Sequence, residues 1–84
     1  MTEIVWDKNA RDFLRKIPKE ISRRIFNKVD IEVRLNVRHY FESLANKDFY
    51  KIRVGDYRLF ADYDARKDIL AIRSIRHRKD AYKQ

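Results

Sequence analysis

One glycine between two alternating segments constrains the fold more than any other feature of the sequence. Residues 49–54 (FYKIRV) and 57–63 (YRLFADY) alternate between two kinds of side chain, which is the period of a half-buried strand. Only Gly55 and Asp56 separate them, and glycine at the first of two central positions favours a type II′ turn. The two segments therefore predict a tight antiparallel hairpin.

This hairpin decides which side chains face each other. Val54 should lie opposite Tyr57, and Arg53 opposite Arg58. One face then carries an apolar set that belongs against the core: Tyr50, Ile52, Val54, Tyr57, Leu59 and Ala61. The other face carries Phe49, Lys51, Arg53, Arg58, Phe60 and Asp62.

The second face concentrates positive charge. Two arginines directly opposite each other repel, and Lys51 adds to them, while Asp62 could relieve part of the repulsion. A bound phosphate would relieve more, because arginine holds phosphate through two parallel hydrogen bonds. The alternative is a solvated face whose charges prevent edge-to-edge aggregation. The direct pairing favours phosphate binding.

The N-terminal half has helical periodicity. Residues 3–6 predict a short strand, and Asp7 is a suitable N-cap for a helix over residues 8–17. Pro18 ends that helix and opens a second one, which extends to about Asn36. The apolar positions of the two helices are Ala10, Phe13, Leu14, Ile17, Ile21, Ile25, Val29 and Val33.

The remaining segments complete an α+β fold. Residues 37–48 (VRHYFESLANKD) are interpreted as a connection, and residues 69–75 as a third strand after the polar turn 64–68. With 84 residues, the chain should form a single domain over residues 1–84. The expected architecture is an N-terminal helical hairpin packed on a small antiparallel sheet.

The charge balance indicates an anionic partner. The sequence has 21 Lys and Arg against 13 Asp and Glu, a net charge of +8, which favours nucleic acid, an anionic membrane or an acidic protein. The C-terminal segment adds candidate RNA-binding side chains and one aromatic for base stacking, although alone it could be a charged tail. These are Arg73, Arg76, Lys79 and Lys83, with His77, Arg78 and Tyr82 among them.

Several classes of protein are excluded or disfavoured. The sequence has no cysteine, so disulfides and thiolate metal sites are excluded. Its longest apolar stretch, Ile69–Ile72, is too short to span a bilayer, and its N-terminus does not resemble a signal peptide. We expect a cytoplasmic protein.

Two segments carry a family resemblance. Residues 50–59 (YKIRVGDYRL) resemble the signature hairpin of the RelE/ParE toxin superfamily, and residues 77–82 (HRKDAY) resemble its C-terminal motif. Their order and spacing match, as does the preceding helical hairpin. The resemblance implies a RelE-like fold with about four strands in a twisted antiparallel sheet, and the toxin of a type II toxin–antitoxin system.

The resemblance also implies an activity. RelE-like members are endoribonucleases (mRNA interferases) that cleave mRNA in the ribosomal A site and so inhibit translation, without metal or cofactor. The 2′-hydroxyl of the RNA attacks the adjacent phosphate, and the leaving 5′-oxygen is protonated. The implied partners are the ribosome, mRNA and an acidic RelB-like antitoxin, in an assembly such as a heterotetramer of two toxins and two antitoxins.

Catalytic roles carry over by position. Lys51 matches a lysine that helps to activate the 2′-hydroxyl, and Arg58 an arginine that stabilises the transition state. Arg78 matches the arginine that stabilises the scissile phosphate and the leaving group. Tyr82 matches a tyrosine that stacks on a base. Arg53 departs from the pattern, since the best-known ribosome-dependent members have a lysine there.

That departure leaves the general base open. Arginine stays protonated in proteins, so Arg53 is a poor base but a good electrostatic stabiliser. The candidate proton acceptors are Lys51, Tyr82 and His77, the last because histidine titrates near neutral pH.

Two other functions compete with RNA cleavage. ParE-like relatives inhibit DNA gyrase by binding it, and they generally lack the full catalytic set. A nucleic-acid-binding module without chemistry is the third hypothesis, because basic charge alone is compatible with it. Retention of Lys51, Arg53, Arg58, Arg78 and Tyr82 favours the nuclease.

Overall fold

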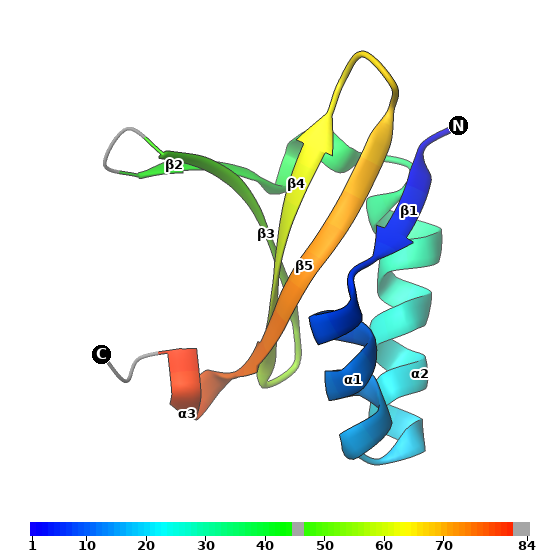
Figure 1. Ribbon diagram of the computed structural model, residues 1–84, viewed down its shortest axis with the longest axis vertical. Helices are drawn as coiled ribbons and strands as arrows, with labels where there is room; N and C mark the ends of the chain where they lie inside the picture. Colours follow the sequence, from blue (N-terminus) through cyan, green and yellow to red (C-terminus); the bar gives the residue numbers. More distant parts are fainter. Residues whose placement is uncertain (45–46, 82–84) are drawn as a thin grey trace.

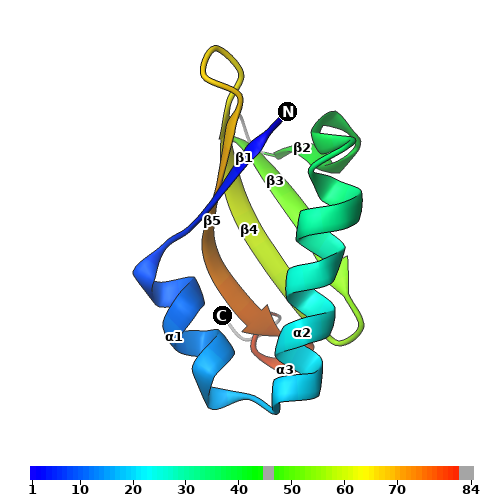
Figure 2. The same ribbon diagram turned by 90° about the vertical axis from the view of Figure 1, so that its right-hand side faces the viewer.

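The computed structural model describes residues 1–44 and 47–81, which form one five-stranded sheet flanked by helices (Figure 1). Two main helices lie together on the same side of the sheet, as both views show (Figure 1, Figure 2). The elements are β1 (Glu3–Trp6), α1 (Lys8–Lys16), α2 (Lys19–Asn27), the π-helix η1 (Lys28–Val33), the 3-10 helix η2 (Val37–Tyr40), β2 (Phe41–Leu44), β3 (Lys47–Val54), β4 (Tyr57–Asp64), β5 (Ile69–His77) and α3 (Arg78–Ala81).

The core lies between the helices and the sheet. Ile25, Val29 and Val33 are fully buried on the helical side, and Ile52 and Leu59 are fully buried on the sheet. Burying each such side chain contributes about 1.5–3 kcal/mol to folding. The apolar positions predicted from the helical periodicity and from the strand alternation therefore form one core. The predicted α+β fold is confirmed.

The central hairpin has the predicted register. Arg53 pairs with Arg58, Ile52 with Leu59 and Val54 with Tyr57. Gly55 has a positive φ of +58°, whereas the φ of Asp56 is not positive. This combination is that of a type II′ turn.

The sheet is larger and more mixed than predicted. Its order is β1-β5-β4-β3-β2, and β1 runs parallel to β5. Residues 41–44, predicted as part of a connection, form strand β2 against β3, where the Phe41 and Tyr50 rings contact each other at 5.4 Å. The α1–α2 segment carries the chain away from β1, so β1 is free to pair in parallel with a distant strand.

The second helix also differs from its prediction. Its α-helical part ends at Asn27, and η1 follows, with the Arg34 amide donating to the Val29 carbonyl five residues back. Asp7 does occupy the N-cap position of α1, but its side chain makes no cap hydrogen bond. No helix in the described part of the chain is long and apolar enough to cross a membrane.

A bulge in β5 sets the direction of its later side chains. Ala61 pairs with Ile72 and Phe60 with Ser74, so Arg73 is the extra residue. Buried positions shift from Leu70 and Ile72 to Ile75. As a result, the side chains after the bulge alternate in the opposite phase.

Candidate functional site

Three arginines form a row across the sheet face that points away from the helices. We call this the outer face; it carries Phe49, Lys51, Arg53, Arg58, Phe60, Asp62, Ser74 and Arg76. Arg53 on β3 pairs with Arg58 on β4, which pairs with Arg76 on β5. The bulge at Arg73 is what brings Arg76 into this arginine row.

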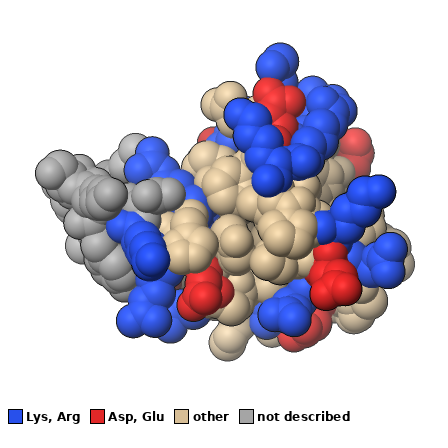
Figure 3. All heavy atoms as spheres, turned by 90° about the horizontal axis from the view of Figure 1, so that it is seen from below, with Lys and Arg blue, Asp and Glu red and all other residues tan. Residues whose placement is uncertain are grey.

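A backbone hydrogen bond holds Arg78 next to the hairpin that carries Arg53 and Arg58. Arg78 begins α3, and its amide donates a hydrogen bond of 2.5 Å to the carbonyl of Asp56 in the hairpin turn. A pocket of about 260 Å³ is lined by Arg53, Gly55, Arg58 and Arg78. Seen from the end of the molecule that carries the β3–β4 turn, Lys and Arg side chains lie on the side of α3 and also across the helical side (Figure 3).

Lys51 lies on the same face, two residues before Arg53. It pairs with Phe60 on β4, and its Nζ lies 3.7 Å from Oε1 of Glu42 on β2. Sequence analysis missed this ion pair because it placed Glu42 in a connection. Residues 41–44 (FESL) do not alternate between apolar and polar side chains, so the sequence has no local signal for that strand.

His77 lies apart from the arginine row. It pairs with Tyr57, whose side chain belongs to the helix-facing set, and the two rings meet edge to face at 5.1 Å. Its Nδ1 accepts a hydrogen bond of 3.1 Å from the Lys79 amide. The imidazole therefore caps the first turn of α3 from the other side of the sheet.

Arg73, a predicted RNA-binding residue, is engaged by two carboxylates. Its Nε donates to Asp62 at 2.8 Å and its guanidinium NH1 to Asp7 at 2.9 Å. These bonds, with Asp7 the larger influence, raise the pKa of Arg73 above its usual value. Asp62, which the sequence places near the Arg53–Arg58 pair, thus has Arg73 as a hydrogen-bond partner.

The structure describes only some of the other predicted residues. Arg76 and Lys79 are exposed. Tyr82 and Lys83 lie outside the described residues, so their roles stay predictions. Within the described residues, no group of three or more His, Cys, Asp and Glu is placed to hold a metal ion.

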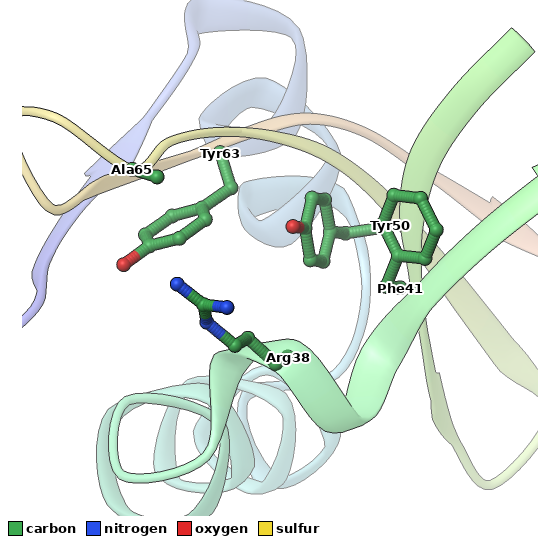
Figure 4. Close-up of a pocket in the computed structure, with 5 residues that line it drawn as sticks. All are labelled: Arg38, Phe41, Tyr50, Tyr63 and Ala65. Atoms are coloured by element: carbon green, nitrogen blue, oxygen red, sulfur yellow. The ribbon is translucent and has the colours of Figure 1, made fainter.

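A second pocket, of about 370 Å³, is mainly aromatic. It is lined by Arg38, Phe41, Tyr50, Tyr63 and Ala65, none of them a predicted site residue. The Arg38 guanidinium points toward Tyr63 (Figure 4). Tyr50 and Tyr63 contact each other edge to face at 5.6 Å. This aromatic pocket shares no lining residue with the arginine-lined pocket, so the two are distinct.

A hydrogen-bonded cluster ties the N-terminus to the β4–β5 turn. The Tyr63 hydroxyl donates to Oδ1 of Asp68 at 2.6 Å, and the Thr2 hydroxyl donates to the same oxygen at 2.7 Å. These bonds lower the pKa of Asp68, and the bond to Asp68 raises the pKa of Tyr63. The cluster contains none of the predicted site residues.

The fold is that of known RelE toxins. The chain matches the toxin–antitoxin complex RelBE2 from Mycobacterium tuberculosis with 20% identity and a TM-score of 0.81, covering 92% of this chain and 98% of that one. It matches the isolated E. coli RelE toxin with 22% identity and a TM-score of 0.75, covering 92% and 84%. The RelE–RelB complex from Pyrococcus horikoshii matches at 20% identity and a TM-score of 0.73, covering 92% and 94%.

The family follows from the sequence match. Residues 4–82 match the family described as "ParE toxin of type II toxin-antitoxin system, parDE". The chain therefore belongs to this family of type II toxins, and the resemblance to the RelE/ParE superfamily is confirmed. No curated protein sequence matches the chain.

Proposed function

We propose that residues 1–84 form one toxin domain that acts in the cytoplasm as a ribosome-dependent, metal-independent endoribonuclease. The observation that supports this most is the pocket lined by Arg53, Arg58 and Arg78. Three arginines around one small pocket are suited to a phosphate whose negative charge increases during reaction. Lys51 lies on the same face of β3, two residues before Arg53.

The proposed reaction is transesterification of mRNA in the A site. The 2′-oxygen forms a bond to phosphorus, the bond from phosphorus to the 5′-oxygen breaks, and the products are a 2′,3′-cyclic phosphate and a 5′-hydroxyl. Arg58 and Arg53 stabilise the charged phosphorane-like transition state, and Arg78 stabilises the scissile phosphate and the departing oxygen. The 2′-hydroxyl proton passes to Lys51 or Tyr82, because His77 packs on Tyr57 at the other side of the sheet.

Primer extension on an mRNA during translation tests the proposal. The wild-type chain should produce discrete cleavage sites, and Arg58→Ala or Arg78→Ala should reduce cleavage by about 10²-fold or more. Arg66→Ala is the matched control, because Arg66 is an exposed arginine in the β4–β5 turn, away from the arginine-lined pocket. Intact mRNA with the wild-type chain would refute the nuclease.

The match to a ParE family supports a second candidate, inhibition of DNA gyrase by protein binding. Under this alternative, the arginine row binds a protein surface and no RNA is cut. Accumulation of gyrase-trapped DNA beside intact mRNA would establish it. RNA affinity without either effect would indicate a non-catalytic binding module.

We also propose an acidic RelB-like antitoxin as partner. A net charge of +8 favours an acidic chain, and several of the matched solved structures are toxin complexes with RelB-type antitoxins. Phe26, Ile31 and Leu35, exposed by 47%, 58% and 74%, offer apolar area along the helical side. Co-purification with the product of an adjacent acidic open reading frame would support the partner, and Leu35→Lys should weaken it.

A further inference from the structure

Two phenylalanines lie on the outer face beside the arginine row. Phe49 on β3 and Phe60 on β4 have ring centroids 6.2 Å apart, with ring planes inclined by 45°. Both rings are partly exposed, while their strand neighbours Ile52 and Leu59 are fully buried. Because the core lies on the opposite face, core packing does not explain two aromatic rings here.

Their position relative to the cations is fixed by the strand register. Phe60 pairs with Lys51 on β3 and with Ser74 on β5, so polar residues flank it on both neighbouring strands. Arg58 lies two residues earlier on the same strand and the same face, a separation of roughly 6.6 Å along the strand. The backbone position of Phe60 therefore lies about one nucleotide spacing along the strand from that of Arg58.

The geometry points to a base-stacking platform: we propose that Phe49 and Phe60 bind an unpaired RNA base while the arginine row holds its neighbouring phosphate. Aromatic rings next to a basic groove are the usual means of binding single-stranded nucleic acid. Duplex bases are already stacked on each other and could not reach the rings, so the platform favours single-stranded RNA. This inference rests on the proposed function, since it assigns a substrate contact to the same face.

Stacking differs from phosphate binding in what it recognises. Each stacked base contributes an affinity gain of roughly 5- to 100-fold, with little sequence preference, because every base has a flat face. A sugar–phosphate chain without bases keeps all its contacts with the arginine row and loses only this gain. A purely structural cross-strand pair of phenylalanines would give no difference between the two.

The test compares two fluorescently labelled oligomers of equal phosphate number by anisotropy, oligouridylate and its abasic counterpart. The wild-type chain should bind oligouridylate at least about fivefold more tightly than the abasic chain. Phe60→Leu and the double variant with Phe49→Leu should abolish this ratio without changing the affinity for the abasic chain. Phe60→Trp should retain it, because tryptophan restores the stacking surface.

Phe41→Leu is the matched control. Phe41 is also an exposed phenylalanine, but its ring packs on Tyr50, which belongs to the helix-facing set. Its variant should keep the wild-type ratio. Unfolding curves for each leucine variant establish that the fold is intact before the affinities are compared.

The two proposals fail separately. A wild-type ratio near one, or a ratio that survives the double leucine variant, overturns the platform even if mRNA is cleaved. A ratio that depends on the two rings, together with intact mRNA in the translation assay, supports the platform and refutes the nuclease. Arg58→Ala should reduce the affinity for both oligomers by the same factor, which distinguishes phosphate contacts from stacking.

Discussion

Arg53 and Arg58 face each other directly across β3 and β4, with Arg76 beyond them on β5. Like charges at paired cross-strand positions destabilise a sheet by about 0.2–1 kcal/mol. We therefore expect Arg53→Gln to raise the free energy of unfolding by about that amount at low ionic strength, measured by urea denaturation. The gain should shrink in high salt, because exposed charges are screened.

The same variant should respond less to phosphate. Added inorganic phosphate should raise the Tm of the wild-type chain more than that of Arg53→Gln, since ligand binding to the folded state stabilises it. Arg66→Gln serves as the control, because it removes an exposed arginine from the β4–β5 turn instead. Equal stability of Arg53→Gln and wild type at low salt would contradict the repulsion.

His77 is predicted to position α3 and not to transfer protons. Asparagine can accept the Lys79 amide hydrogen bond as the imidazole does, so His77→Asn should cleave mRNA within about threefold of wild type. Its pH–rate profile should keep the same shape. Loss of one limb of that profile between about pH 5 and 8 would instead identify His77 as the acid or base.

Arg73 and Arg76, three residues apart, should have opposite roles. Arg73 is bound to Asp7 and Asp62, so Arg73→Gln should lower the free energy of unfolding slightly and leave RNA affinity nearly unchanged. Arg76 pairs with Arg58 across the strands, so Arg76→Gln should raise the free energy of unfolding at low ionic strength, as Arg53→Gln should. It should also reduce the salt dependence of single-strand binding by about 0.7 in slope. Identical effects of the two variants would contradict the different roles that the bulge gives to Arg73 and Arg76.

This division also shows what the sequence could predict. The Gly55–Asp56 turn and its flanking alternation are local, so the facing arginines follow from the sequence alone. The bulge at Arg73 depends on pairing between β4 and β5, and no residue type marks it. Without the bulge, Arg73 and Arg76 cannot be told apart by charge.

Pairings between segments distant in the sequence could not be predicted from the sequence. The parallel β1–β5 pair joins Glu3 to Ile69, and no turn signal connects them. Strand β2 is short and its sequence is also compatible with a loop, so the Glu42 partner of Lys51 was not foreseen. Local chemistry predicted the arginine pair, whereas tertiary pairing decided which carboxylates reach the cations.

The Thr2–Asp68–Tyr63 cluster should make stability depend on pH at both extremes. Hydrogen bonds from Tyr63 and Thr2 lower the pKa of Asp68 below 3.8, so its contribution is complete above that value and is lost as the pH falls through the lowered pKa. The bond to Asp68 raises the pKa of Tyr63 above 10.0, so its contribution is complete below that value and is lost as the pH rises through the raised pKa.

Asp68→Asn tests the acidic side. Asp68 has φ +55°, a conformation that asparagine tolerates, so the turn should persist while the charge is removed. The stability difference between wild type and Asp68→Asn, from urea denaturation, should be constant near neutral pH and shrink below about pH 4. Tyr63→Phe should remove the loss above about pH 10 as well. A difference that stays constant with pH would mean that the Asp68 charge contributes nothing to folding, because a charge-dependent bond must weaken when its acceptor is protonated.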